Sequence, residues 1–500
     1  MSDHTGLSDD QQQAAAAFAA WLEAPADGVP FVLEGYAGTG KTFLSMRFLA
    51  QAERAGLCWT VVAPTHKAVG VLRHHLALAG LHPTWYPSTI HRLLRLKLKR
   101  QGDRERCEET LQTALALENL GLVLVDEASM VDGGLLEITL RCAQAYRTRL
   151  VFVGDPAQLP PVGEERSPVF ALGRARRVAL THVVRHGGPV LRLAGGLREG
   201  ALPCRRPPLL DPVRTAEGRV SLLGRADWLE AAQAGLRRSA EADDPDLARI
   251  LCYTNRSLER LVPIARRALH GAMADQLPVL PGEVLITRTA VMAPACREGD
   301  AAAEEPDLLL GSNRELLVRD VRPDRCDLAE FGVEASLGAA VIDTLNATVE
   351  AGESQLNLRL LPPIGSTARA CLDGVLERLR LQAREAGQKD GKALWRRFFL
   401  VRDAFASLGP AAVLTVHRSQ GSTFGEVFID EDVFWPRDLA LRQRLVYVAV
   451  SRASQAVTLM AAAADAGDRE HWDRWLRDTG AAAGSTGNGD AQKGPDPLPS

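Results

Sequence analysis

The sequence predicts an α/β fold of the doubly wound type, in which helices cover both faces of largely parallel sheets. Three observations predict this fold. Short apolar runs alternate with helix-like stretches; the runs are largely apolar, as expected for strands buried on both faces; and polar residues follow the runs, where open α/β sheets bind ligands. In the first half of the chain these runs are residues 31–33, 58–63, 121–125, 150–153 and 178–180.

Length and composition set the outer limits. The 500 residues suggest about three domains. The net charge of −3 gives no overall attraction to nucleic acid, so a site for a polyanion must be a local basic patch. The eight cysteines are scattered without a C-x-x-C pair, which argues against a zinc site or disulfide framework and favours a reducing cytoplasm. The polar N-terminus is not that of a signal peptide, and no apolar run is long enough to span a membrane.

A glycine-rich segment at residues 35–42 is the strongest local signal. It fits the pattern G-x-x-x-x-G-K-[ST] and lies between a strand-like run and a helix-like stretch at 43–54. Glycines let the backbone curl so that its N–H groups point at phosphate oxygens, and the helix N-terminus adds positive charge. A plain turn is the alternative, but strand, loop and helix in register favour a site for a nucleoside triphosphate with Mg²⁺. Its candidate residues are Gly35, Gly38, Thr39, Gly40 and Lys41 for the phosphates, and Thr42 for the metal.

The segment upstream of this loop predicts a helix over residues 12–22, opened by a capping box at 8–11. Capping alone explains Gln11. A glutamine just before a phosphate loop can also read the adenine edge, and the two roles conflict only partly.

Two polar segments follow strands or lead into helices in the first half. Residues 64–68 follow a strand, and their backbone N–H groups, Thr65 and Lys67 can hold a phosphodiester backbone. A second polar cluster lies at 88–91. A plain helix cap is the alternative for such a segment.

Residues 94–99 alternate strictly between apolar and basic side chains, and a turn-like segment at 101–103 follows. This pattern predicts a β-hairpin with one basic face, whose second strand returns through 104–107. A solvated helix is the alternative, because leucine, lysine and arginine also favour helices.

Carboxylates and a glutamine follow two further strands. Asp126 and Glu127 come directly after the run at 121–125. Asp126 is suited to hold Mg²⁺ through its water shell, and Glu127 to orient and deprotonate an attacking water. Gln158 lies beyond the run at 150–153, where it can sense a γ-phosphate, although an ordinary polar loop residue is the alternative.

The second half predicts another α/β unit that is interrupted by an insertion. A proline-rich connection at 203–212 leads into it, and a helix at 439–449 lies near its end. The insertion, about 281–404, carries strand patterns and a charged helix, which suggest a small β-domain. Residues 480–500 are rich in Gly, Ala, Ser and Pro and are expected to be disordered. The unit's strand-like runs are residues 248–253, 412–415 and 427–429, and those of the insertion are 283–287, 315–321 and 356–361.

Two segments near the C-terminus carry a specific resemblance. Residues 415–424 and 447–453, taken with the phosphate loop and the acidic pair before them, occur in the order of the motifs of superfamily 1 DNA helicases. The chain resembles the Dda/RecD-like branch of that superfamily most closely. The resemblance runs from about residue 7 to residue 460.

The resemblance implies two RecA-like domains that face each other across one ATP, a strand-separating pin and an SH3-like accessory insertion that braces the pin. The pin region has no aromatic residue between Arg95 and Glu118, so an aliphatic or arginine contact would have to meet the fork base. The implied boundaries are 1–93 and 119–186 for the first domain, 94–118 for the pin, 187–280 and 405–475 for the second domain, and 281–404 for the insertion.

The resemblance also implies roles for individual residues. Arg452 would reach over from the second domain and complete the ATP site only when the cleft is closed. The other ATP-site residues would be Gln11, the phosphate loop, Asp126, Glu127, Gln158, Arg185, Gln420 and Gly421. Contacts to single-stranded DNA are implied for Thr65, His66, Thr89 and His91 in the first domain and for Thr254, Asn255, Thr415 and His417 in the second.

In these terms the chain is expected to be an ATP-dependent DNA helicase. It would move along single-stranded DNA, 5′ to 3′ as this branch generally does, and separate forked duplex DNA. An ATP-switched DNA-binding subunit of a nuclease or recombination complex is the alternative, and a motor that acts on RNA is a third possibility.

Overall fold

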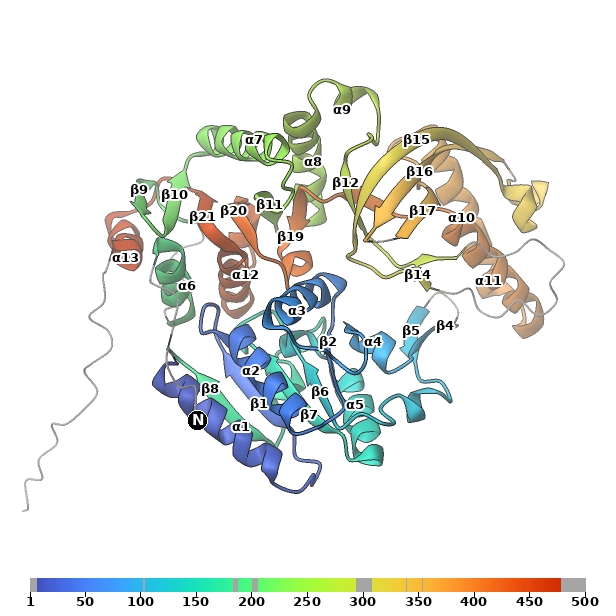
Figure 1. The fold of residues 1–500 in the computed structure, drawn as a ribbon. Coiled ribbons are helices and arrows are strands. Elements are labelled where there is room, and N and C mark those ends of the chain that lie inside the picture. Colours follow the sequence, from blue (N-terminus) through green and yellow to red (C-terminus); the bar gives the residue numbers. More distant parts are fainter. Residues whose placement is uncertain are drawn as a thin grey trace, which may run out of the picture.

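Three sheets organise the chain. The computed structural model describes residues 7–101, 104–182, 188–199, 206–293, 308–338, 340–352 and 354–477. Two six-stranded sheets with their helices form the first and the second unit, one below the other in Figure 1, and a five-stranded sheet with two long helices forms an insertion beside them. Within the described ranges, no helix is both long enough and apolar enough to cross a membrane.

The first unit, coloured blue to cyan in Figure 1, is a parallel sheet with helices on both faces. Its elements are α1 (Asp9–Glu23), β1 (Phe31–Gly35), α2 (Lys41–Arg54), β2 (Trp59–Ala63), α3 (His66–Ala79), β3 (Ser88–Thr89), α4 (Ile90–Leu93), η1 (Thr113–Leu115), β6 (Leu122–Val125), η2 (Ala128–Met130), α5 (Gly133–Tyr146), β7 (Arg149–Gly154), η3 (Pro168–Ala171) and β8 (Arg176–Leu180). The strand order is β3-β2-β6-β7-β1-β8. Because successive strand residues point to opposite faces, Phe31 and Leu33 pack with α1, α2 and α3, whereas Val32 packs with α4 and α5.

The second unit, green and red in Figure 1, repeats this architecture with one antiparallel edge. Its elements are α6 (Pro189–Glu199), β9 (Leu210–Thr215), β10 (Gly218–Leu223), α7 (Arg225–Glu241), β11 (Ala248–Cys252), α8 (Asn255–His270), α9 (Met273–Gln276), β19 (Val413–Thr415), η6 (Val416–Ser419), β20 (Phe424–Ile429), η7 (Glu431–Phe434), α12 (Leu439–Ser451), β21 (Ala453–Met460) and α13 (Ala466–Arg477). The strand order is β19-β11-β20-β21-β10-β9, and only β9 is antiparallel to its neighbour. Leu251 packs with α6, α12 and α13, whereas Ile250 and Cys252 pack with α7 and α8.

Part of the expected proline-rich connection is a strand of the second unit. The expected connection at 203–212 runs into β9, which contains Pro212. A proline fits there because β9 is an edge strand and its pairing with β10 is irregular between Val220 and Leu222. The sequence also gives no prediction of β21, which lies inside the sheet.

The insertion is an antiparallel sheet packed beside two helices, yellow to orange in Figure 1. Its elements are β12 (Val284–Thr287), β13 (Val291–Met292), β14 (Leu308–Leu310), β15 (Glu315–Asp327), η4 (Leu328–Phe331), η5 (Ala335–Leu337), β16 (Val341–Ala351), β17 (Ser354–Arg359), α10 (Thr367–Glu385), α11 (Gln388–Asp403) and β18 (Leu408–Pro410). The order β17-β16-β15-β12-β18 places the long strand β16, which the sequence does not predict, next to β15. The α/β class with two mainly parallel sheets and an inserted β-structure is therefore confirmed, while the SH3-like comparison stays a prediction.

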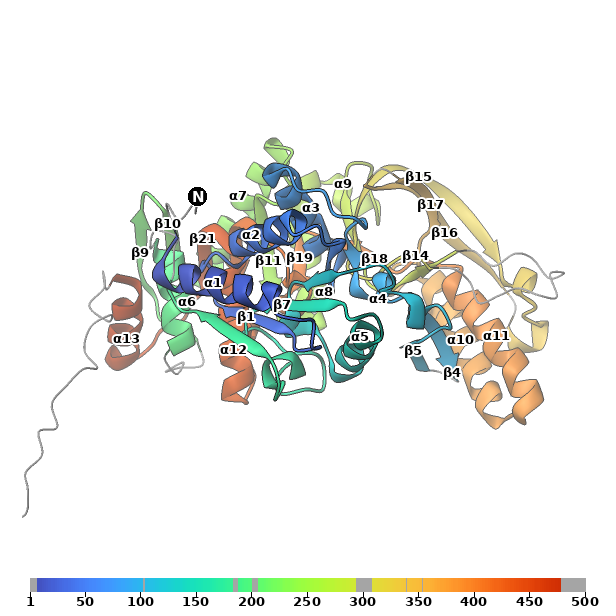
Figure 2. The same ribbon diagram turned by 60° about the horizontal axis from the view of Figure 1, so that its bottom comes forward.

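The basic alternating segment forms a hairpin, as predicted. Strands β4 (Lys97–Gln101) and β5 (Arg104–Glu108) pair antiparallel, with Lys97 opposite Glu108 and Gln101 opposite Arg104. Residues 102 and 103 of the expected turn, and the expected disordered tail at 480–500, lie outside the described residues. Both views place the hairpin beside α11 of the insertion (Figures 1 and 2).

Candidate active site and nucleic-acid interface

The phosphate loop has the backbone that its glycines permit. Gly38 and Gly40 both have φ of +82°, in the left-handed region that side chains with a Cβ rarely adopt. A Cβ at Gly40 would lie 2.5 Å from Nε2 of Gln11, and one at Gly35 would lie 2.7 Å from Oγ1 of Thr39. Close packing and left-handed backbone therefore both require glycine in this loop.

Helix α2 begins directly after the loop, at Lys41. The first turn of a helix leaves N–H groups without intrahelical acceptors, and here those groups belong to Lys41, Thr42 and Phe43. The Lys41 ammonium donates to the carbonyl oxygen of Tyr36 at 2.9 Å, so it is folded back over the loop. The loop thus offers N–H donors, a helix N-terminus and an ammonium to one anion.

Gln11 joins the helix α1 cap to the phosphate loop. Its Oε1 accepts from the Ser8 N–H at 3.2 Å within the predicted capping box, which is confirmed. Its Nε2 donates to the carbonyl of Thr39 at 2.9 Å. A primary amide has two N–H donors and two acceptor lone pairs, so one of each remains for a base edge. Capping and adenine reading are compatible in this geometry.

The acidic pair follows β6 at the same edge of the sheet. The Asp126 carboxylate accepts from the Glu127 N–H at 2.9 Å, and Glu127 itself has a strained φ of +52°. Burial and the neighbouring Glu127 carboxylate raise the pKa of Asp126 to about 7, while the Lys41 ammonium lowers it. A buried carboxylate in this state is suited to a divalent cation, which favours its ionised form.

Gln158 lies in the loop after β7 with an unused acceptor. Its side chain is 5% exposed, and among the described residues its Oε1 has no hydrogen-bond partner. Buried polar atoms are almost always hydrogen-bonded in folded proteins. Together with the phosphate loop and Asp126, this orphaned oxygen fits a site that takes a polar ligand such as Mg²⁺-ATP.

The second unit contacts the phosphate loop through Tyr447 of α12. The Ala37 N–H donates to the Tyr447 hydroxyl at 3.2 Å, and this hydroxyl donates to Asp155 at 2.6 Å. Nearby, the guanidinium of Arg198 in α6 lies 4.0 Å from the centre of the Tyr36 ring. The sequence does not predict these contacts, although Tyr447 precedes Arg452 in one motif. The two units therefore meet at the phosphate loop.

Arg452 lies just behind that contact. It is 5% exposed and donates to the carbonyls of Val448 and Ser422, at 3.3 and 3.2 Å, and to Oγ of Ser451 at 3.1 Å. Its positive charge lowers the pKa of Tyr447, which burial and Asp155 raise overall. The guanidinium is thus held within the second unit, close to the residue that touches the phosphate loop. Arg185 lies outside the described residues.

Gln420 and Gly421 also face the first unit. Gln420 donates to the carbonyl of Leu159 at 3.1 Å, one residue beyond Gln158. Gly421 has φ of +74°, and a Cβ there would lie 3.2 Å from Oγ1 of Thr65. Gln420 therefore borders the ATP site, whereas Gly421 lies against the start of α3.

The residues expected to contact DNA occupy equivalent places in the two sheets. Thr65 and Thr254 follow the strands β2 and β11, and Thr89 and Thr415 end the adjacent strands β3 and β19. All four threonines are N-caps, and His66, His91, Asn255 and His417 follow within the first turns. Helix N-termini with capping hydroxyls are common phosphate contacts. Parallel pairing thus brings each unit's candidate residues together at one sheet edge.

The three candidate histidines are buried enough to stay neutral. Burial, aided by the charges of Arg314, Arg73 and Arg92, lowers the pKa of His66 to about 4. Burial also lowers the pKa of His91 and His417. At neutral pH these rings can exchange hydrogen bonds with a nucleotide but bring no charge.

We expect His66→Asn to leave the salt dependence of single-stranded DNA binding unchanged at about pH 6 as well as at about pH 8. A lowered pKa keeps His66 neutral above about pH 4, so it releases no counterion. Fluorescence anisotropy of a labelled oligothymidylate measures the slope of log K against log[salt]. A wild-type slope steeper than the variant's by about 0.7 at the lower pH alone would show that His66 is charged.

Comparisons with known proteins show what the chain is similar to. The model of an AAA domain matches residues 6–205, and that of a UvrD-like helicase C-terminal domain matches residues 410–460. The chain is 25% identical over 430 residues to the ATP-dependent DNA helicase dda of Enterobacteria phage T4, covering 84% of this chain and 92% of that protein. It is 33% identical to the ATP-dependent RecD2 DNA helicase of Deinococcus radiodurans over 40% of this chain and 25% of that protein. A crystal structure of Pif1 helicase from Bacteroides with ADP-AlF3 and ssDNA has 14% identity and a TM-score of 0.43, covering 90% of this chain and 92% of that one.

Proposed function

The chain belongs to the Dda/RecD-like branch of the superfamily 1 helicases, and we propose that it is an ATP-dependent DNA helicase that moves 5′ to 3′ along single-stranded DNA and separates forked duplex. One observation carries this proposal: Tyr447 of the second unit is hydrogen-bonded to the phosphate loop of the first, at Ala37. Whatever nucleotide occupies that loop acts on the contact between the units. The same two units present matching sets of candidate DNA contacts, so a change at the ATP site alters their spacing along the strand.

In this proposal the first unit binds the base of the nucleotide and makes most of the contacts to its charged phosphates. Gln11 reads the base, Lys41 and the loop N–H groups hold the phosphates, and Thr42 and Asp126 hold Mg²⁺, which supplies charge neutralisation at the phosphates. Glu127 accepts a proton from the attacking water. Gln158 contacts the terminal phosphate by donating from its amide NH2 group, and its unused oxygen can accept from a water. Arg185 and Arg452 add positive charge where it develops in the transition state, with Gln420 beside them.

We assign the DNA contacts to Thr65, His66, Thr89 and His91 in the first unit and to Thr254, Asn255, Thr415 and His417 in the second. The domain boundaries proposed are those implied by the resemblance, with 94–118 as the pin and 281–404 as an SH3-like insertion that braces it. The position of the hairpin beside α11 supports this assignment. DNA base-pair steps are worth on average about 1.4 kcal/mol, so unwinding needs a wedge as well as a motor. A cytoplasmic location is part of the proposal.

Duplexes with single-stranded tails test the proposal. With ATP and Mg²⁺, the protein is expected to release the strand from a duplex with a 5′ tail and to leave a duplex with a 3′ tail annealed. A strand-displacement gel with both substrates, beside a blunt duplex as control, measures this. Release from the 3′-tailed substrate alone would reverse the polarity. Hydrolysis stimulated by single-stranded DNA without any strand release would leave only translocation.

A further inference from the structure

A cavity of about 490 Å³ lies where the first unit, the second unit and the insertion meet. Its lining includes His66 and Thr89, two of the candidate DNA contacts. It also includes charged residues from three sources: Arg73 and Arg92 from the first unit, Asp246 from the second, and Arg314 and Glu315 at the start of β15 in the insertion. The sign of the net charge on the cavity lining depends on which of these side chains are paired with opposite charges.

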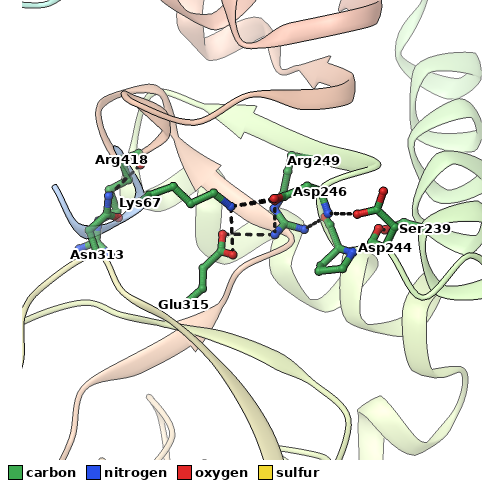
Figure 3. Close-up of polar contacts among 9 residues, drawn as sticks. Lys67, Ser239, Asp244, Asp246, Arg249, Asn313, Glu315 and Arg418 are labelled. Carbon is green, nitrogen blue, oxygen red and sulfur yellow. Dashed lines mark hydrogen bonds and ion pairs between the residues drawn. The ribbon is translucent and has the colours of Figure 1, made fainter. Parts of the chain in front are cut away.

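The two carboxylates of the lining are fully paired with cations. Lys67 of α3 contacts Asp246 at 2.8 Å and Glu315 at 3.1 Å. Arg249, which is 3% exposed, contacts the same two carboxylates at 3.5 and 3.3 Å, and Figure 3 shows the four side chains in one cluster. Although burial opposes the ionisation of Glu315, Arg249 and Lys67 hold its pKa below the usual range. The two positive and two negative charges of this cluster therefore balance. The charge of Lys67 is already neutralised by carboxylates and is not available to an anion.

Three arginines of the lining remain without such balance. In the described part of the chain, Arg73, Arg92 and Arg314 form no ion pair with any carboxylate. Neutral groups orient two of them: Arg73 donates to the carbonyl of Pro87 at 3.2 and 2.6 Å, and Arg314 donates to that of Ala351 at 2.8 Å. Burial and then the charges of Arg73 and Arg92 lower the pKa of Arg314, so the three guanidiniums lie close enough to repel one another. Like charges held together without a counter-charge indicate a site for an anion.

We propose that Arg73, Arg92 and Arg314 form a phosphate-binding site for the single DNA strand, built jointly by the first unit and the insertion. This inference rests on the proposed function. Guanidinium groups bind phosphodiester oxygens through a planar fork of N–H donors, and oriented side chains lose less freedom on binding. The site adjoins the N-caps at Thr65 and Thr89, so the same strand can reach both. The insertion then holds the strand itself through Arg314, in addition to bracing the hairpin.

Charge-removing variants test the site. Arg92→Gln and Arg314→Gln are expected to weaken binding of a labelled oligothymidylate roughly tenfold each and to reduce the slope of log K against log[salt] by about 0.7 each. Arg92 is exposed, so its replacement leaves the fold intact. Arg319→Gln is the matched control: Arg319 lies on β15, which begins directly after Arg314, but it pairs with Glu350 at 2.7 Å and is outside the cavity lining. ATP hydrolysis without DNA should be unchanged in Arg319→Gln, which lies outside the cavity lining.

The outcomes separate this proposal from the proposed function. If both variants bind oligothymidylate with the wild-type affinity and slope, the arginine site is wrong, although the motor can still be a helicase. If the three variants lose affinity equally, the effect is general charge and the site is also wrong. If the wild-type protein does not bind oligothymidylate and its ATP hydrolysis is not stimulated by it, the proposed function is wrong, and the arginine site is wrong as well.

Discussion

Lys41→Ala is expected to reduce ATP hydrolysis by at least about 10²–10³-fold, the loss typical of removing one group that stabilises developing charge. Two observations support the proposed role of Lys41: its ammonium donates to the Tyr36 carbonyl of the phosphate loop at 2.9 Å, and its charge lowers the pKa of Asp126. Alanine removes the charge but keeps the helix, because alanine favours helices. A coupled ATPase assay, with and without single-stranded DNA, measures the loss.

The matched control for this variant is Lys392→Ala. Lys392 is an exposed lysine on α11, in the insertion, so its replacement removes the same charge far from the phosphate loop. Near-normal turnover in Lys41→Ala would contradict the assignment of the loop. An equal loss of ATP hydrolysis in both variants would show that the effect comes from net charge. Thermal melting of each variant tests whether it is folded.

Arg452→Ala is expected to retain nucleotide binding and to lose about 10³-fold or more in kcat, the range found for arginines that complete a phosphoryl-transfer site. Arg452 is bonded within the second unit, to Val448, Ser422 and Ser451, but its charge reaches Tyr447 at the phosphate loop. A group that acts only after the cleft closes contributes to kcat and little to ground-state binding. The KM for ATP should therefore stay within about twofold.

A structural role for Arg452 predicts a different result. Removing a buried arginine leaves its acceptors unsatisfied, at about 1–3 kcal/mol of stability, which would lower the melting temperature without a selective effect on kcat. Arg442→Ala is the control, because Arg442 lies on α12, the helix that ends just before Arg452, and is also 5% exposed. Equal losses of activity in the two variants would make Arg452 a packing residue. An unchanged rate of ATP hydrolysis in Arg452→Ala would show that Arg452 is not part of the active site.

The parts of the fold that the sequence predicts are those governed by local rules. Strands such as β2 and β6 are largely apolar because both faces are covered, and a run of this kind is visible in the sequence. The phosphate loop and the acidic pair can be recognised in the sequence for a related reason. The loop glycines and the two carboxylates come just after apolar runs of this kind. Parallel pairing then brings Thr65 next to Thr89, and Thr254 next to Thr415, without further information.

The parts that the sequence does not predict depend on partners far along the chain. β9 is half exposed and contains a proline, so it carries no apolar signal, yet it forms the edge of the second sheet. The pairing of Lys67 with Asp246 and Glu315 joins residues from three parts of the chain. Lys67 taken alone predicts a phosphate contact, whereas its neighbours leave that role to Arg73, Arg92 and Arg314. Contacts between units, such as Tyr447 with Ala37, follow from how whole sheets dock.

The junction between α12 and β21 constrains how the motor can move. The helix ends at Ser451 and the strand begins at Ala453, so Arg452 is the single residue between them. A loop of several residues would let the backbone of an arginine move while its sheet stayed in place. This junction has no such loop. Any displacement of the Arg452 backbone carries β21 with it, and β21 is hydrogen-bonded to β10 and β20 on its two sides. If Arg452 approaches the phosphates as proposed, we therefore expect the second sheet to move together with the Arg452 backbone and the bending to occur elsewhere in the chain.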